Sequence, residues 1–163
     1  MQKYILGVDI GTTSTKAGLF SLDGDMFGFA QQGYPLFQDL NGMAEQDSEQ
    51  IYAAVLQVIA ELSAQVSPEQ IIALSFSSAM HSLIVLDQHQ QPLTRCITWA
   101  DNRAAAASQW LAAQPEAEEL YQRTGVPNHP MTPLAKIIWL RQEQAELFAQ
   151  AAYFISIKEY IFL

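Results

Sequence analysis

The sequence predicts an α/β domain in which helices flank a mixed sheet. Three β-rich runs follow one another near the N-terminus, and segments with apolar residues at helical spacing then alternate with further strand-like runs. With 163 residues, half of them hydrophobic, the chain is long enough to bury a substantial core. We therefore assign residues 1–163 to one domain.

The first three strands are expected at Tyr4–Ile10, at residues 15–21 and at residues 26–32. β-Branched and aromatic residues are frequent in these runs, and short turns separate them, the second at residues 22–25. Short turns join antiparallel neighbours, so these strands should form a three-stranded meander.

A helix is expected at residues 48–64, after a loop at residues 33–46. Asp47, with Gln50 three residues later, is typical of a helix N-terminus. Apolar residues then recur at helical spacing, namely Ile51, Val55, Val58, Ile59 and Leu62.

Three further strands are expected at residues 71–76, 83–86 and 93–99. A short capped turn at residues 67–70 precedes the first of them. The polar residues 87–92 form a turn between the other two.

The last third of the chain is expected to be mainly helical. Helices are predicted at residues 103–113, 115–124 and 133–142, and a strand at residues 153–157. Gly125 is a C-terminal signal for the second helix. The sequence stops at Leu163 without turn or cap residues, so we expect the domain to be incomplete.

The charge balance makes nucleic acid an unexpected partner. The formal net charge is −9, with only eight Lys and Arg residues, so no basic stripe can neutralise a phosphate backbone. No signal-peptide pattern is present, and no stretch approaches the roughly 20 apolar residues that cross a bilayer. We expect a cytoplasmic protein with no membrane partner, in which the lone Cys96 is a buried side chain.

The run YILGVDIGTTSTKAGLF places a polar turn between two strand-like stretches. Gly11 allows a tight turn whose amides point into one concavity, and the hydroxyls of Thr12, Thr13 and Ser14 can donate to anionic oxygens. Lys16 adds a positive charge just beyond the turn, as phosphate contacts commonly require. The turn is therefore a candidate phosphate-binding site.

Asp9, at the end of the first strand, would repel a phosphate unless a divalent cation lay between them. The acid therefore predicts Mg²⁺, held mostly through water. The pattern is not the Walker loop G-x-x-x-x-G-K-[ST], because strand-like sequence follows it where that loop leads into a helix. On the residues alone, an ordinary hairpin turn with capping hydroxyls is an equal alternative.

Four stretches of the chain, taken in order, resemble a known family. D-I-G-T-T-S-T-K resembles the first phosphate motif of the actin, hexokinase and Hsp70 superfamily, whose members share a ribonuclease-H-like domain. The later stretches resemble the N-terminal domain of the FGGY carbohydrate kinases, and within it the gluconokinase branch: S-F-S-S-A-M-H-S-L-I-V-L-D, I-T-W-A-D-N-R and T-G-V-P-N-H-P-M-T-P-L-A-K-I-I-W-L. The first motif is common to the superfamily, whereas the ordered set is specific and spans nearly all of the chain.

The resemblance implies a kinase that uses ATP and Mg²⁺ to phosphorylate a sugar acid such as gluconate, in a cleft between two domains. Another acceptor such as xylulose, and a nucleotide-dependent sugar sensor without phosphoryl transfer, remain open as alternatives. The general base of the family, an aspartate, is expected beyond Leu163. The oligomeric state is left open, and a homodimer is one of the allowed states.

The resemblance also implies roles for individual residues. On the phosphate and magnesium side it places Asp9, Thr12, Thr13 and Lys16. On the sugar side it places Met80, His81, Trp99 and Met131, with Asp101, Arg103 and His129 nearby. A gluconate carboxylate would also need a cation, for which Arg103 and Lys136 are candidates.

Each sugar-side residue has a structural alternative. His81 can be a structural histidine, and Trp99 can be a core side chain. Asp101 and Arg103 can pair with each other or cap a helix, and His129 can belong to no more than a rigid turn. The residue types by themselves leave these alternatives open.

Overall fold

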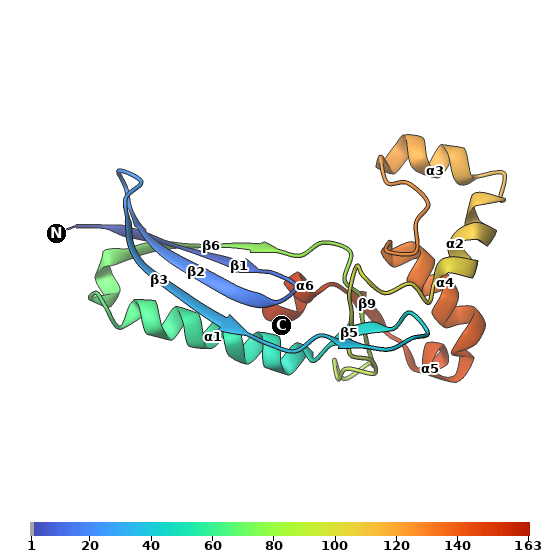
Figure 1. Ribbon diagram of the computed structural model, residues 1–163, viewed down its shortest axis with the longest axis horizontal. Helices are drawn as coiled ribbons and strands as arrows, with labels where there is room; N and C mark the ends of the chain where they lie inside the picture. Colours follow the sequence, from blue (N-terminus) through green and yellow to red (C-terminus); the bar gives the residue numbers. More distant parts are fainter. Residues whose placement is uncertain (1) are drawn as a thin grey trace. The chain divides into compact units, whose positions relative to one another are not determined.

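The computed structural model describes residues 2–163 and divides into two compact units. The first unit contains the residues up to Leu36, together with Asp47–Ala79 and Ile161–Leu163. The second unit contains Phe37–Gln46 and Met80–Tyr160. Each unit combines strands with helices, so the predicted α/β class is confirmed (Figure 1).

The first unit is built on a four-stranded sheet in the order β3-β2-β1-β6 (Figure 1). β1 (Tyr4–Ile10) pairs antiparallel with β2 (Ser14–Ser21), which pairs antiparallel with β3 (Met26–Gly33). β6 (Ile71–Ser78) extends the sheet beside β1 in the parallel direction. The expected meander is therefore present, within a mixed sheet.

α1 (Ser48–Ser63) packs against one face of this sheet (Figure 1). Alternate residues of β1 are buried on that side, namely Tyr4, Leu6, Val8 and Ile10. The helix buries one stripe, formed by Ile51, Ala54, Val55, Val58 and Leu62. Because side chains alternate along a strand, the residues between those of β1 face away from the helix.

The start of α1 is fixed by Asp47, as the sequence predicts. One carboxylate oxygen accepts hydrogen bonds from the backbone amides of Glu49 at 2.9 Å and Gln50 at 3.3 Å. These amides would otherwise lack partners in the first helical turn. After α1, the short 3₁₀ helix η1 (Pro68–Gln70) leads into β6.

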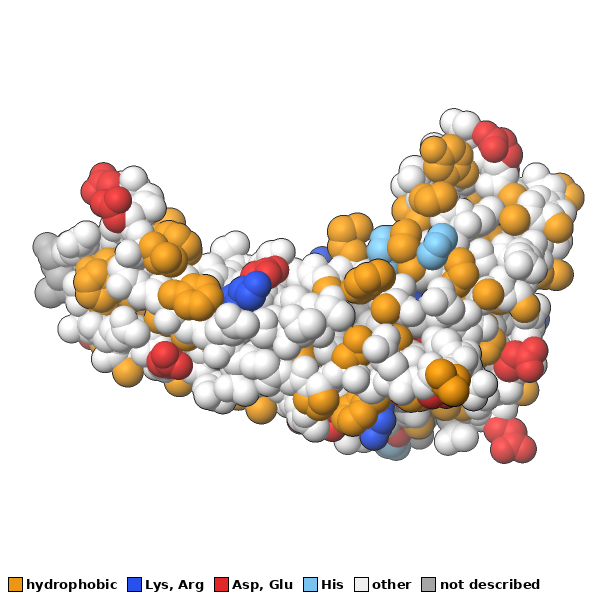
Figure 2. Space-filling model, in the orientation of Figure 1, with side chains coloured by type: hydrophobic (Ala, Val, Ile, Leu, Met, Phe, Trp, Pro, Cys, Tyr) orange, Lys and Arg blue, Asp and Glu red, His pale blue; other side chains and the backbone are white. Residues whose placement is uncertain are grey.

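The second unit combines two small sheets with helices. One sheet contains β4 (Phe37–Gln38), β5 (Ala44–Gln46) and β8 (Cys96–Ile97), and the other pairs β7 (Ile84–Leu86) with β9 (Tyr153–Ile155). The helices are α2 (Ala105–Ala112), α3 (Ala117–Thr124), α4 (Pro133–Glu143), α5 (Ala145–Gln150) and α6 (Ile157–Ile161). Its apolar core includes Leu83, Val85, Ile97 and Leu140. Figure 2 shows histidine side chains among hydrophobic ones on one face of this unit.

The loop expected at residues 33–46 is wrong, because this segment contains the hairpin β4–β5. Asp39 closes the hairpin by accepting hydrogen bonds from the backbone amides of Asn41 at 2.8 Å and Met43 at 2.9 Å. Gly42 adopts φ +90°, a conformation that favours glycine. Strands of two and three residues are too short to produce a recognisable alternation in the sequence.

The strand expected at residues 93–99 is also wrong over most of its length, because only Cys96 and Ile97 form β8. The Thr94 hydroxyl accepts a hydrogen bond from the backbone amide of Val85 at 3.0 Å, which replaces a regular ladder contact. α5 is absent from the prediction, and none of its residues is fully buried. Within residues 2–163, no helix combines the length and the hydropathy required to cross a bilayer.

Candidate phosphate-binding turn and sugar-side residues

The turn between β1 and β2 is tightly closed at Gly11. The Gly11 amide donates to the Ser14 carbonyl at 3.1 Å, so it is already used within the turn. A Cβ atom at Gly11 would lie only 3.1 Å from that same carbonyl oxygen, which favours glycine here. The Tyr34 hydroxyl donates to the Gly11 carbonyl at 2.6 Å, and the Tyr34 amide donates to the Thr13 carbonyl at 3.3 Å. The turn is thus held from both sides.

The hydroxyl residues of the turn differ in their exposure. Thr13 is exposed and Thr12 is partly exposed, so both can contact a ligand. Ser14 is buried, and its hydroxyl accepts a hydrogen bond from the Gln31 side-chain amide at 3.0 Å. The structure therefore places Ser14 under the turn, where it supports the exposed residues.

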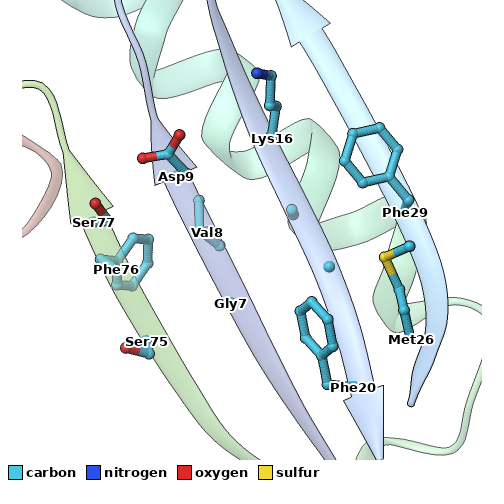
Figure 3. A pocket seen from close by; sticks show the side chains of 12 residues that line it. Gly7, Val8, Asp9, Lys16, Phe20, Met26, Phe29, Ser75, Phe76 and Ser77 are labelled. Atoms are coloured by element: carbon cyan, nitrogen blue, oxygen red, sulfur yellow. The ribbon is translucent and has the colours of Figure 1, made fainter. Parts of the chain in front are cut away.

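Asp9 and Lys16 lie on the face of the sheet opposite α1. They are directly paired in the register of β1 and β2, and both side chains are exposed (Figure 3). Among residues 2–163, neither side chain forms an ion pair or a side-chain hydrogen bond. A carboxylate and an ammonium group thus project from the same face, at the end nearest the Gly11 turn.

A shallow hollow of about 400 Å³ adjoins these two side chains. Gly7 and Gly18 are neighbours across the strand pair and leave its floor without side chains. A Cβ atom at Gly18 would lie 2.5 Å from the Phe20 ring. Phe20 lies at the end of the hollow away from Asp9 and Lys16 (Figure 3). The hollow therefore has a charged end and an apolar end.

The charged end suits the phosphate and magnesium part of a nucleotide. Lys16 and the exposed Thr13 hydroxyl can donate to phosphate oxygens. The Asp9 carboxylate is a hard oxygen ligand of the kind that Mg²⁺ prefers, and Mg²⁺ usually keeps several waters beside one or two carboxylates. Among residues 2–163, no three His, Cys, Asp or Glu side chains form a group that could hold a metal ion, and Asp9 is an acidic residue that lines the hollow.

The residues predicted for the sugar side all fall within the second unit. Met80 has 70% and Trp99 has 48% of its surface exposed, so neither is a core side chain. His81 lies between Met80 and β7, is partly buried, and adopts φ 64°, which is uncommon for a residue other than glycine.

His129 and Met131 lie immediately before α4. The Met131 amide donates to His129 Nδ1 at 3.1 Å, while the His129 carbonyl accepts from the amide and the hydroxyl of Thr132. Thr132 in turn caps α4 by accepting from the Ala135 amide at 3.3 Å. The turn is rigid, and the His129 side chain remains exposed.

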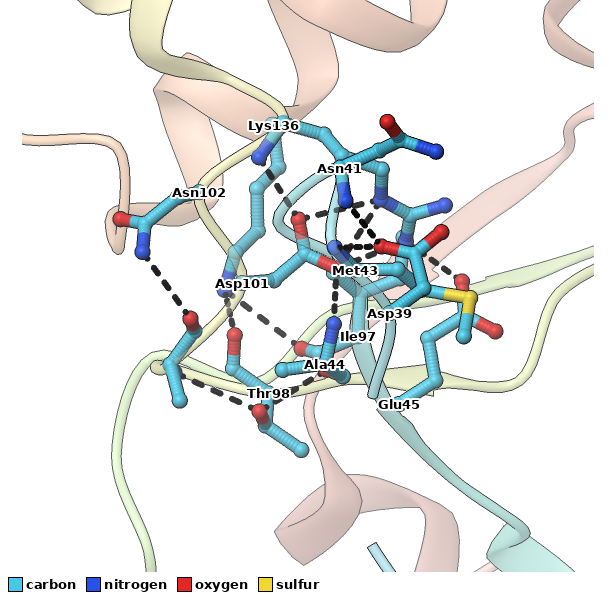
Figure 4. Close-up of polar contacts among 12 residues, drawn as sticks. Asp39, Asn41, Met43, Ala44, Glu45, Ile97, Thr98, Asp101, Asn102 and Lys136 are labelled. Carbon is cyan, nitrogen blue, oxygen red and sulfur yellow. Dashed lines mark hydrogen bonds and ion pairs between the residues drawn. The ribbon is translucent and has the colours of Figure 1, made fainter. Parts of the chain in front are cut away.

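Asp101 and Arg103 form the ion pair that the structural alternative describes. Asp101 is 1% exposed, and its carboxylate accepts from the Ala44 amide at 2.9 Å and from the Arg103 guanidinium at 2.7 Å (Figure 4). Arg103 also pairs with Glu45 at 2.5 Å and lies over the Trp139 ring. Burial opposes the charged guanidinium, but the hydrogen bonds that the guanidinium donates to Asp101 and Glu45 outweigh it and raise the pKa of Arg103. Both side chains are thus committed to this network.

Lys136 has a role that the sequence analysis does not predict. Its side chain is fully buried, and its ammonium group donates to the carbonyl oxygens of His81, Ile97 and Thr98. It therefore lacks a free donor for a substrate carboxylate. The one signal in the sequence is a single lysine inside the apolar run PLAKIIWL. Tyr34, which braces the Gly11 turn, has no signal because it lies in an expected loop.

Comparisons with known proteins agree with the motifs. The model of the FGGY family of carbohydrate kinases, N-terminal domain, matches residues 4–163. A gluconokinase of Bacillus subtilis (strain 168) is 48% identical over 162 residues, which cover 99% of this chain and 32% of that protein.

Two solved structures give the same result. The crystal structure of gluconate kinase from Lactobacillus acidophilus has a TM-score of 0.92 and 43% identity, covering 99% of this chain and 32% of that one. Ligand-bound xylulose kinase from Lactobacillus acidophilus also has a TM-score of 0.92 and 43% identity, covering 98% and 32%. The chain thus spans about a third of the length of each of these relatives.

Proposed function

Since the chain belongs to the FGGY family of carbohydrate kinases, through that family's N-terminal domain, we propose that it is part of an ATP-dependent gluconate kinase. The reaction is transfer of the γ-phosphoryl group of ATP to the primary C6 hydroxyl of D-gluconate, which gives 6-phosphogluconate. The similarity to a gluconokinase over almost the whole chain is the observation that carries the proposal.

On the phosphate side, Lys16 and Thr13 donate to the phosphate oxygens of ATP, and the closed Gly11 turn keeps these groups in place. Asp9 binds the magnesium ion or its water ligands. Mg²⁺ and ATP supply the reactive phosphoryl group and its charge neutralisation when bound, so the protein's task is chiefly alignment. The exposure of Asp9 and Lys16 on one face of the sheet supports this assignment.

On the sugar side, His81 offers ring nitrogens to sugar hydroxyls, and Trp99 offers a flat apolar surface to C–H groups. Met80, His129 and Met131 complete this set. The exposure of Met80 and Trp99 supports contact with a ligand. Asp101 and Arg103 support this set of residues by holding the segment that follows Trp99.

The proposal places the general base, an aspartate that accepts the proton of the attacking hydroxyl, outside residues 1–163. It also treats these residues as one incomplete domain of a longer kinase. The relatives' greater length supports both statements.

Xylulose is the second candidate acceptor, because a xylulose kinase structure matches this chain as closely as a gluconate kinase structure does. A panel of sugars and sugar acids, assayed with the full-length protein and ATP, separates the two. We expect the highest kcat/KM with gluconate. A clear preference for a ketose would replace gluconate as the substrate, and the absence of any phosphorylated product would refute the kinase assignment.

Substitutions on the phosphate side and on the sugar side should differ in their effects on kcat and KM. We expect Lys16→Ala in the full-length enzyme to lower kcat by about two orders of magnitude, since the lost charge acts on the transferred phosphoryl group. His81→Ala is expected to act mainly on the KM for gluconate. Wild-type turnover in Lys16→Ala would contradict the phosphate assignment.

A further inference from the structure

We propose that Lys136 is a positioning residue for the sugar site, and that its ammonium group holds His81 and the residue before Trp99 in one arrangement. This inference rests on the proposed function, because it takes His81 and Trp99 as sugar contacts. Lys136 itself is fully buried and does not touch a ligand.

The ammonium group joins three segments of the second unit. It projects from α4 and donates to the carbonyl oxygen of His81 at 2.5 Å. It also donates to the carbonyl oxygens of Thr98 at 2.8 Å and Ile97 at 3.4 Å (Figure 4). An ammonium group has three donors, and each has an acceptor here. An apolar side chain at this position would leave buried carbonyl groups without this partner, which is costly.

His81 needs such support because its backbone is in the left-handed region. Its φ of 64° costs free energy in a residue with a Cβ atom, and such conformations persist where neighbouring contacts enforce them. Lys136 holds the His81 carbonyl, and the next residue is anchored through the Ser82 hydroxyl, which accepts from the Ile157 amide at 3.0 Å. The backbone that carries the imidazole is therefore held on its C-terminal side.

Trp99 is attached to the same ammonium group through Thr98. The Thr98 carbonyl binds Lys136, and it also accepts from the Asp101 amide at 3.2 Å. The Thr98 amide and hydroxyl both donate to the Ala44 carbonyl, at 3.0 and 2.9 Å. Trp99 thus follows a residue whose amide, hydroxyl and carbonyl groups are all hydrogen-bonded. The ammonium group that binds the Thr98 carbonyl also binds the His81 carbonyl.

The charge state of Lys136 agrees with this role. Burial lowers the pKa of the amine to about 8, opposed in part by the nearby Asp101 and Cys96 and aided by Arg103. At neutral pH the amine is therefore protonated in most molecules and can use all three donors.

The test compares variants of the full-length kinase for the KM of gluconate, the KM of ATP and kcat. Lys136→Met keeps the length of the side chain and removes its donors. We expect it to raise the KM of gluconate by at least about tenfold while the KM of ATP stays within about twofold of wild type. Leu140→Ala, one turn along α4 in the apolar core, is the matched control: it should lower Tm and leave both KM values within about twofold.

A double variant tests whether Lys136 acts through His81. If it does, His81→Ala combined with Lys136→Met should raise the KM of gluconate by less than the product of the two single effects. A gluconate KM near wild type in folded Lys136→Met, with a clear increase in His81→Ala, overturns this inference alone. No increase in either variant overturns the proposed sugar site and this inference together.

If Lys136→Met does not fold, hydrogen–deuterium exchange of the wild-type enzyme replaces it. Gluconate binding should then slow exchange in residues 80–83, 97–101 and 134–138 together, because Lys136 joins these segments. Slower exchange confined to the first two segments would overturn the inference.

Discussion

The pairing of Asp9 with Lys16 shows how the positions of single residues led us to the candidate phosphate side. Strand alternation puts both side chains on the face away from α1, and the register of β1 and β2 puts them opposite each other. This placement follows from the sequence once the two strands are recognised. The bracing of the turn by Tyr34 does not, because it joins residues from different segments through one side chain.

Gly11→Ala tests the geometry of the turn. The new Cβ atom would lie 3.1 Å from the Ser14 carbonyl oxygen, so the turn must shift, and we expect kcat/KM for ATP to fall by about tenfold. Gly33→Ala is the control, since its Cβ atom would meet the Thr13 carbonyl at an ordinary 3.7 Å. If kcat/KM for ATP in Gly11→Ala were no lower than in Gly33→Ala, the turn would tolerate the displacement and the prediction would be contradicted.

The burial of Lys136 predicts a specific dependence of stability on pH. Its folded pKa of about 8 lies below its ordinary value of 10.5, so between these values the unfolded chain holds a proton that the folded chain has released. The free energy of unfolding should therefore rise with pH through this residue. Between about pH 7.5 and 10.5, wild type should gain on the order of 3 kcal/mol relative to Lys136→Met.

Urea unfolding of both proteins at the two pH values measures this difference. A difference that stays constant, or that moves in favour of the Met variant as the pH rises, would contradict the lowered pKa of Lys136.

At the scale of elements, the predictable parts of the fold are those with long periodic patterns and clear end signals. α1, with five buried apolar positions and the Asp47 cap, lies almost where it is expected, as does α3, which ends at Gly125 with φ 66°. The hairpin β4–β5 and the strand β8 could not be predicted, because each of these strands has only two or three residues, and β8 pairs with β5 about 50 residues away in the sequence. Tertiary contacts, and not local patterns, determine these elements.

The distance in sequence between partners also explains which contacts of the second unit could be predicted. Asp101 and Arg103 pair two residues apart, which the sequence allows as an alternative. Lys136 reaches carbonyl groups 38, 39 and 55 residues away, and no local pattern encodes such contacts.

The cap of α1 gives a prediction at this scale. Asp47→Ala removes the acceptor for the amides of Glu49 and Gln50, and we expect the free energy of unfolding to fall by about 1 kcal/mol. Asp47→Asn keeps an acceptor oxygen and should change it by only a few tenths of a kcal/mol. Chemical denaturation compares the three proteins, and an unchanged midpoint in Asp47→Ala would show that the cap does not contribute to stability.

At the scale of the whole molecule, the candidate phosphate residues belong to the first unit and the candidate sugar residues to the second. The chain spans about a third of the length of its relatives, so the proposed reaction belongs to a longer protein. Phosphoryl transfer requires the two sets of residues to meet across one pair of substrates, which is the central claim of the proposal.

A crystal structure of the full-length protein with gluconate, Mg²⁺ and a non-hydrolysable ATP analogue tests this claim most directly. We predict the terminal phosphate within hydrogen-bonding distance of Thr13 or Lys16, the metal bound to Asp9 directly or through water, and gluconate in contact with His81 and Trp99. A triphosphate bound away from the Gly11 turn, or gluconate bound away from His81, would contradict the account.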